Sequence, residues 1–216
     1  MTDVPLFDPA EHEPLCSDSW NEQAAREFVA RVVRDADDAF QPAQFWPLHP
    51  EDRYDEERSG LRGVYCGAAG TMWALHRLAT DNGLALRNDY AQAIVQCEEA
   101  YRSDPWETKG AVPSYFLGTT GIMAARYALT NDTNLYGAIE AEIRANVDNP
   151  TREALWGAPG SAIAALLVRE RDGARCFDDV LRAVQDALWK TWIPADAPLG
   201  LLWEQELSGR TCRYVG

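Results

Sequence analysis

The chain has 216 residues, of which 46% are hydrophobic, 25% charged and 10% aromatic, and this is the composition of a globular protein. Acidic residues outnumber Lys and Arg by 34 to 20, which gives a net charge of −14 and disfavours binding to nucleic acid or to anionic membrane surfaces. No apolar run could span a bilayer, and the N-terminal residues lack the features of a signal peptide. We expect a cytoplasmic protein, with an N-terminal extension at 1–18 and one domain at 19–216.

Four segments place apolar residues three or four positions apart, with charged residues on the opposite side, which predicts amphipathic helices. Their expected ranges are 19–40, with Ser19 as the cap, then 88–101, 134–147 and 177–192. In the first of them the expected core face consists of Trp20, Ala24, Phe28, Val32 and Ala36.

A Gly-x-x-Gly repeat occurs three times between these helices, in VYCGAAGTMWALHRLA, YFLGTTGIMAARYALT and ALWGAPGSAIAALLVR. Glycine admits turn conformations and lets neighbouring elements approach closely. The stretches after the second glycines are apolar nearly all round, as in a buried helix. We therefore expect three inner helices behind glycine turns. The repeat-turn glycines are Gly67, Gly70, Gly118, Gly121, Gly157 and Gly160.

Outer and inner helices thus alternate, which predicts an all-α fold and favours an α/α toroid, with an open solenoid of helical hairpins as the alternative. The segments LLWEQEL and RTCRYV, around Ser208 and Gly209, predict a short β-hairpin. Four outer helices with three inner ones make about three and a half helical hairpins. We expect an incomplete half-toroid, the N-terminal part of a longer ring.

The glycine repeats, with LWGAPGSAIAAL and LLWEQELSGRTCRYVG, resemble the lanthionine synthetase C-like (LanC-like) family over its N-terminal half, from about Gly60 to Gly216. The resemblance implies a toroid with a central zinc ion. In the family's cyclases that zinc activates a peptide cysteine, which adds to dehydroalanine or dehydrobutyrine to form a thioether; eukaryotic relatives add or bind glutathione. A metal ion that stabilises a thiolate at neutral pH supplies such a nucleophile.

The same resemblance implies that the zinc ligands and the catalytic histidine of the family lie outside this chain. No catalytic residue, metal ligand or cofactor is therefore expected within residues 1–216, and the chain alone should be inactive. Ser114 stands where the family has an aspartate before the second glycine pair.

Tyr65, Cys66, Tyr115 and Trp156 lie one to three positions before the glycine pairs and are candidates for lining a cavity that holds a peptide or a partner protein. Packing of the turns is the alternative interpretation, and a hydrogen-bonded core or rim position is expected for His76. The second functional hypothesis is a non-catalytic peptide- or protein-binding module. Exposed helix flanks would also permit self-association.

The third hypothesis is an α/α-toroid glycoside hydrolase that uses Glu204 and Glu206, which lie two apart on an expected strand. A solvated strand face is the alternative. Five cysteines, odd in number and widely spaced, indicate reduced thiols rather than a disulfide framework.

Overall fold

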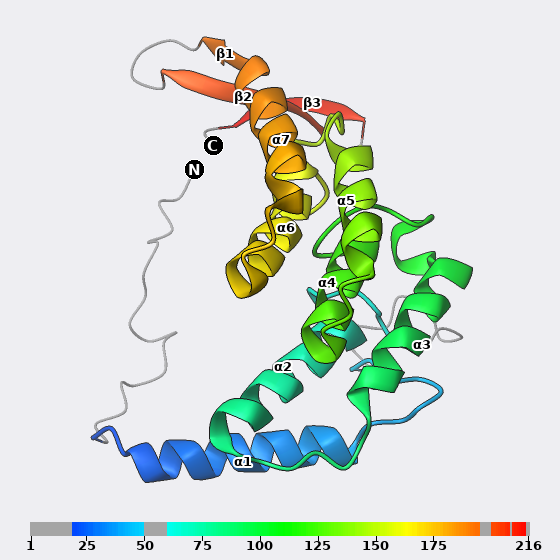
Figure 1. Cartoon of the computed structure of the whole chain (residues 1–216), viewed down its shortest axis with the longest axis vertical. Coiled ribbons are helices and arrows are strands. Elements are labelled where there is room, and N and C mark those ends of the chain that lie inside the picture. The colour runs from blue at the N-terminus through cyan, green and yellow to red at the C-terminus, as the bar shows by residue number, and fades with distance from the viewer. Residues whose placement is uncertain (1–18, 50–59, 195–199, 208, 215–216) are drawn as a thin grey trace, which may run out of the picture.

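The computed structural model describes residues 19–49, 60–194, 200–207 and 209–214 (Figure 1). Within these ranges the chain forms seven α-helices and one small antiparallel sheet, so the prediction of a mainly helical fold is confirmed. The helices are α1 (Glu22–Asp38), α2 (Ala68–Asn82), α3 (Tyr90–Ser103), α4 (Thr119–Thr130), α5 (Leu135–Asn146), α6 (Ala158–Asp172) and α7 (Asp178–Lys190). The strands are β1 (Trp192–Pro194), β2 (Leu201–Leu207) and β3 (Arg210–Tyr214). The predicted extension at 1–18 lies outside the described residues.

The helices alternate between two layers of a curved array, in which α2, α4 and α6 lie on one side and α3, α5 and α7 on the other (Figure 1). We call the side formed by α2, α4 and α6 the inner face. α1 packs on α2 at one end of the array, and α7 with the sheet forms the other end. In the described part of the chain no helix is both long and apolar enough to cross a membrane.

The predicted core face of α1 is wrong except at Ala36, which is partly buried against the core. Trp20, Phe28 and Val32 are exposed by 82%, 56% and 41%. The helix packs instead through a second apolar stripe, which includes the buried Val33 and the partly buried Val29. α1 therefore carries two apolar stripes and buries one. Asn21, and not Ser19, is its cap, since the Asn21 side chain accepts a hydrogen bond from the backbone N–H of Ala24 at 2.9 Å.

The inner helices begin directly after the first glycine of each pair, so the predicted starts after the second glycine are wrong. The N-caps are Gly67, Gly118 and Gly157. None of these three has a positive φ, and so the repeat is not explained by a left-handed turn. The second glycine of each pair lies in the first turn of the helix.

Close approach of the preceding loop explains the glycines. A Cβ on Gly121 would lie 1.6 Å from the Tyr115 carbonyl oxygen, and a Cβ on Gly118 would lie 1.9 Å from that of Val112. The loop uses this proximity to cap the helix: the Val112 carbonyl accepts from Thr119 N at 3.0 Å, and the Ser114 carbonyl accepts from Gly121 N at 3.3 Å. First-turn N–H groups, which have no partner inside a helix, thereby find acceptors.

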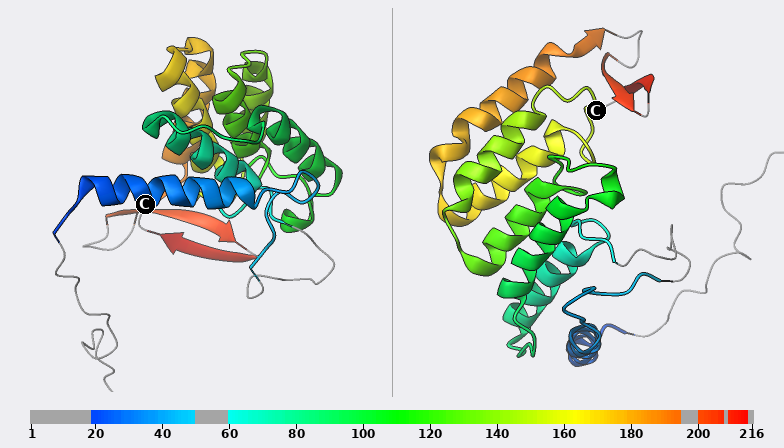
Figure 2. Two further views of the ribbon diagram at one scale, coloured as in Figure 1. Left: turned by 90° about the horizontal axis from the view of Figure 1, so that it is seen from below. Right: turned by 90° about the vertical axis from the view of Figure 1, so that its right-hand side faces the viewer.

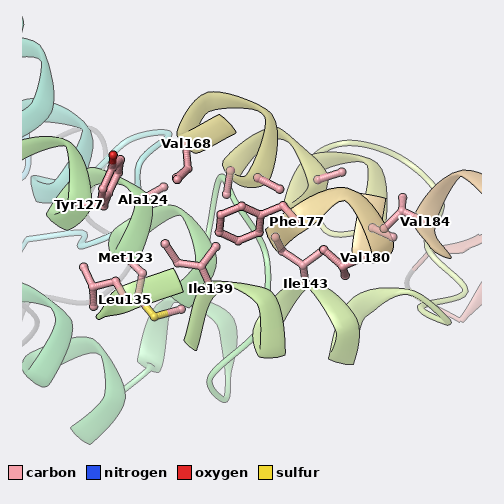
Figure 3. Close-up of a cluster of buried hydrophobic side chains, with 14 residues drawn as sticks. Met123, Ala124, Tyr127, Leu135, Ile139, Ile143, Val168, Phe177, Val180 and Val184 are labelled. Carbon is pink, nitrogen blue, oxygen red and sulfur yellow. The ribbon is translucent and has the colours of Figure 1, made fainter. Parts of the chain in front are cut away.

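Two clusters of buried side chains make up the core, and α4 contributes to both. The N-terminal cluster gathers side chains from α1–α4, among them Met72 and Ile122. The C-terminal cluster gathers side chains from α4–α7 around Phe177, which lies among Ile139 and Val180 (Figure 3). These two clusters hold the helices of the array together.

Of the three inner helices, α4 is buried nearly all round as expected, since none of its residues is exposed, whereas α2 and α6 are not. Trp73 on α2 and Leu166 and Leu167 on α6 are exposed by 42%, 51% and 41%. Only the sides of these helices that face the neighbouring helices of the array are covered. The apolar character of their remaining surface therefore needs another explanation.

The predicted hairpin is confirmed: β2 pairs antiparallel with β3, from Trp203 opposite Tyr214 to Leu207 opposite Arg210. Ser208, predicted in its turn, lies outside the described residues. A third strand, β1, was not predicted, because its first residue, Trp192, was assigned to the preceding helix. The sheet follows the C-terminal end of α7 (Figure 2), and the Trp203 indole N–H donates to the Leu188 carbonyl at 3.0 Å.

Candidate functional site

A pocket of about 480 Å³ lies on the inner face between α2, α4 and α6. Its floor is the side of α4 that carries Gly121, Ala124, Ala125 and Ala128, and these small side chains leave the space open. Its lining residues from α2 are Trp73, His76, Arg77, Thr80 and Asp81, and those from α6 are Leu167, Val168, Glu170 and Arg171. Val64, Tyr115 and Tyr127 complete it.

Aromatic and aliphatic side chains give the pocket apolar walls. Trp73 and Leu167 stand on opposite helices and are 42% and 41% exposed although both are large and apolar. Tyr115 comes from the loop that caps α4, and burial raises the pKa of its phenol. Burial and the hydrogen bond to Asp172 likewise raise the pKa of Tyr127. Both tyrosines therefore stay neutral at physiological pH and act as hydrogen-bonding aromatic surfaces.

Two guanidinium groups lie at the polar edges of the pocket. Arg77 Nε lies 2.6 Å from Asp81 Oδ2, one turn further along α2. Arg171 donates to the Ala128 carbonyl at 3.0 Å and to the Asn131 side chain, and its guanidinium lies 5.5 Å from the centre of the Tyr127 ring. The pocket thus offers fixed donors and acceptors on the two sides of an apolar floor.

Asp172 lies beside the pocket without lining it. The hydroxyls of Tyr127 and Tyr136 both donate to its Oδ2 atom, and these hydrogen bonds lower the pKa of the carboxyl group. An ionised carboxylate therefore orients the ring of Tyr127, which in turn faces the guanidinium of Arg171. The contacts with Asp172 and Arg171 therefore hold the ring of Tyr127 in place in the pocket wall beside α6.

The four cavity candidates from the sequence are placed differently. Tyr115 lines the pocket, whereas Tyr65, Cys66 and Trp156 are not among its lining residues. Tyr65 is exposed by 65%. The ring of Phe116 lies edge-on to Tyr115 at 5.0 Å and to Tyr65 at 6.1 Å, which brings these two tyrosines into one aromatic group. Cys66 is exposed, and Trp156 is partly buried.

Ser114, the residue in place of the family's aspartate, is buried. Its hydroxyl donates to the Leu155 carbonyl at 2.5 Å and accepts from Leu117 N at 3.0 Å. Ser114 therefore links the loop before α4 to the loop before α6. Its hydrogen-bonding capacity is used inside the protein.

Glu204 and Glu206 are exposed on one face of β2, as expected for a solvated strand face. Glu204 lies 3.6 Å from Arg213 on β3. Neither carboxylate lines the pocket between α2, α4 and α6.

Most of the pocket was missed from the sequence. Trp73, Leu167 and Tyr127 belong to stretches that were interpreted as buried inner helices, and His76 alone was considered as a rim residue. A signal was present: Trp73, Arg77 and Thr80 follow helical spacing and mix apolar with polar residues, which is unusual for a helix buried all round.

No group of three or more His, Cys, Asp or Glu side chains able to hold a metal ion occurs among residues 19–49, 60–194, 200–207 and 209–214. Comparisons of the chain with protein-family models, with curated proteins and with solved structures find no match.

Proposed function

We propose that this protein is a peptide-binding α/α array of the LanC-like type, and that the pocket between α2, α4 and α6 is its binding site. The observation that carries the proposal is the 480 Å³ pocket itself, since its size lies within the roughly 300–1,000 Å³ usual for ligand sites. The glycine-led helices α2, α4 and α6 follow one another along its walls, which supports a toroid-type arrangement.

The chemistry of the lining favours a peptide over a sugar or a nucleotide. Trp73, Tyr115 and Tyr127 provide aromatic surfaces for apolar side chains. The polar edges offer carboxylates as well as guanidinium groups, which suits the paired donors and acceptors of a peptide backbone. The net charge of −14 opposes polyphosphate ligands.

The LanC-like part of the proposal names the class of peptide: one that carries a cysteine and a dehydrated serine or threonine. Binding is the role proposed for the residues of this chain. Thiol activation by zinc is assigned to none of them, so we expect binding without thioether formation.

Titration of a fluorescently labelled peptide with one cysteine and one dehydroalanine tests the binding. We expect saturable binding that Leu167→Arg weakens at least about tenfold, because the new charge enters the apolar wall. Leu166→Arg is the matched control, since Leu166 is the adjacent exposed leucine of α6 and does not line the pocket. Equal losses in the two variants, or no saturation with the unsubstituted chain, would refute the site.

Alkylation of the peptide after incubation tests the chemistry, because ring closure by addition leaves the mass unchanged but removes the free thiol. We expect every cysteine to remain alkylatable, with or without added zinc. Loss of the thiol at unchanged mass, and faster than in the peptide alone, would show that this chain is itself a cyclase.

A further inference from the structure

The polar side chains that line the pocket between α2, α4 and α6 are of two kinds. The first kind is bonded within the protein, as Arg77 is to Asp81 and Arg171 is to the Ala128 carbonyl. The second kind has no side-chain hydrogen bond or ion pair within the part of the chain that the structure describes. Its members are Trp73, His76, Tyr115 and Glu170. These four side chains keep their hydrogen-bonding capacity for a ligand.

Glu170 is the charged member of this set, and its charge is not balanced by a neighbour. Four lining side chains are charged, namely Arg77, Asp81, Glu170 and Arg171. Arg77 pairs with Asp81, and the charge of Arg171 interacts with the carboxylate of Asp172 beside the pocket. The Glu170 carboxylate is exposed and forms no ion pair with any described residue. The unpaired charge that the pocket offers is therefore negative.

Trp73 adds an aromatic surface that suits a cation. It lies on α2, across α4 from the helix of Glu170, and it is 42% exposed. The ring of Tyr127 already faces the Arg171 guanidinium at 5.5 Å, whereas the Trp73 ring faces no cation among the described residues. Cations are attracted both to the face of a tryptophan ring and to a carboxylate.

His76 and Tyr115 supply hydrogen-bonding groups beside these two. His76 follows Trp73 by three positions, so both lie on the same side of α2. The hydroxyl of Tyr115 is neutral at physiological pH, because burial raises its pKa. An imidazole and a phenol each donate and accept hydrogen bonds, as a peptide backbone requires. A backbone and a charged side chain of one ligand can therefore be bound in the same pocket.

The charge of the whole protein acts in the same direction. A net charge of −14 attracts cations over long distances and opposes the approach of anions. Both the local and the long-range electrostatics therefore favour a positively charged ligand.

We propose that the pocket selects its peptide by a lysine or arginine side chain, whose cation binds the Glu170 carboxylate and packs against the Trp73 ring. The aliphatic stem of such a side chain suits the floor formed by Ala124 and Ala128, since stems of this kind cover apolar surface while their charged ends stay in contact with water. This inference rests on the proposed peptide binding and adds the side chain by which the peptide is recognised.

Titration of two series of labelled peptides tests the selection. All peptides carry one cysteine and one dehydroalanine. One series places an arginine at each remaining position in turn, and the other places a glutamine there. At one position or more, the arginine peptide should bind at least about fivefold more tightly, because a charge-assisted hydrogen bond and a ring contact are gained. The advantage should shrink between about 50 mM and about 500 mM salt, which screens the attraction.

Glu170→Gln should remove the advantage of the arginine peptide and leave the affinity of the glutamine peptide unchanged. Glu99→Gln is the matched control, since it changes the net charge equally on the exposed side of α3, away from the pocket. It should retain the advantage. Trp73→Leu keeps an apolar wall without the ring and should reduce the advantage about two- to fivefold. Circular dichroism of each variant verifies that its helices are intact.

Equal affinities of the two series at every position overturn the selection but leave peptide binding in place. An advantage that survives in Glu170→Gln, or that disappears equally in Glu99→Gln, overturns it as well, because the cation would then not be bound by Glu170. Absence of binding in both series refutes the proposed function itself. The two proposals can therefore fail separately.

Discussion

Asp37 is a buried carboxylate, 3% exposed, that ties α1 to the start of α3. It accepts hydrogen bonds from Arg87 N at 2.7 Å, from the Asn88 side chain at 2.9 Å and from the Tyr90 hydroxyl at 2.7 Å. Burial alone would raise the pKa of Asp37, but these hydrogen bonds outweigh it and hold the pKa below the ordinary value. The ionised form is therefore the one that the fold stabilises.

Asp37→Asn should lower the free energy of unfolding by about 1–3 kcal/mol at neutral pH, because an amide accepts these donors less well than a carboxylate. The pKa of Asp37 is lower in the folded state, so its contribution is present above about pH 4 and is lost as pH falls through the folded pKa. Denaturant titrations from acid to neutral pH measure this. The difference between the two proteins should shrink at the acid end.

Asp35→Asn is the control for this substitution, since Asp35 lies on the exposed side of the same helix. It should change the free energy of unfolding by less than about 0.5 kcal/mol. An Asp37→Asn protein as stable as the Asp35→Asn protein would contradict the role given to the buried carboxylate.

Thiol reactivity should separate the cysteines by burial. Cys66 and Cys176 are exposed, whereas Cys97 is fully buried, and burial, with the nearby Glu107 carboxylate, raises the pKa of its thiol to about 12. Alkylation of the folded protein followed by peptide mass mapping should label Cys66 and Cys176 first. Cys97 should react only after unfolding; early labelling of Cys97 would contradict its burial.

Individual residues were the least predictable scale. The expectation of reduced thiols agrees with the structure, since the four described cysteines are free, while Cys16 lies outside the described residues. The buried Asp37 and Ser114 left no sequence signal, because the Tyr90 hydroxyl that bonds to Asp37 and the Leu155 carbonyl that bonds to Ser114 lie 53 and 41 residues away in the chain. A single sequence carries no record of such distant hydrogen bonds.

A capping side chain marks the start of α3, but such a signal was misplaced for α1, whose cap is Asn21 rather than Ser19. α3 begins at Tyr90, two residues after the predicted start at 88, behind the Asp89 cap, whose carboxylate accepts from Ala91 N at 3.0 Å. The starts of α2, α4 and α6 were misplaced because backbone carbonyls of the preceding loops cap them. A cap made from backbone has no residue preference except the glycines that make room for it.

Gly121→Ala should therefore destabilise the protein by about 3 kcal/mol or more, because the added Cβ would lie 1.6 Å from the Tyr115 carbonyl oxygen and force the capping loop away. Gly137→Ala in α5 is the matched control, since nothing lies within 4 Å of its Cβ position. It should be neutral or stabilise by up to about 1 kcal/mol. Thermal unfolding of the two variants measures the contrast, and similar melting temperatures would show that the close approach is unimportant.

The two stripes of α1 explain the other error at this scale. Helical spacing identifies Phe28 with Val32 and Val29 with Val33 as apolar pairs, but it does not rank them. The second pair is buried because the chain continues into Phe40 and Trp46, whose rings pack on Tyr90.

At the scale of the whole molecule, the alternation of helices followed from the sequence, whereas the pocket did not. Its floor depends on the packing of three helices that are far apart in the chain. The order of amphipathic and glycine-led segments follows from local sequence. The side of each inner helix that stays uncovered depends instead on packing between helices that are far apart in the chain.

Phe177→Ala should unfold the array unevenly. Phe177 is fully buried in the C-terminal cluster, so its truncation should cost about 3–5 kcal/mol. Hydrogen exchange should accelerate most in α5–α7 and least in α1–α3, as in other arrays whose units contact only their neighbours. Equal acceleration throughout would indicate that the two clusters unfold as one unit.

α4 is the helix that joins the N-terminal and the C-terminal clusters. It supplies Ile122 to the N-terminal cluster and Met123 to the C-terminal one, and Ala124 and Ala128 to the pocket floor. A ligand bound on that floor would contact a helix that the N-terminal and the C-terminal clusters share. A bound ligand should therefore stabilise both clusters together, because they share the helix that it contacts.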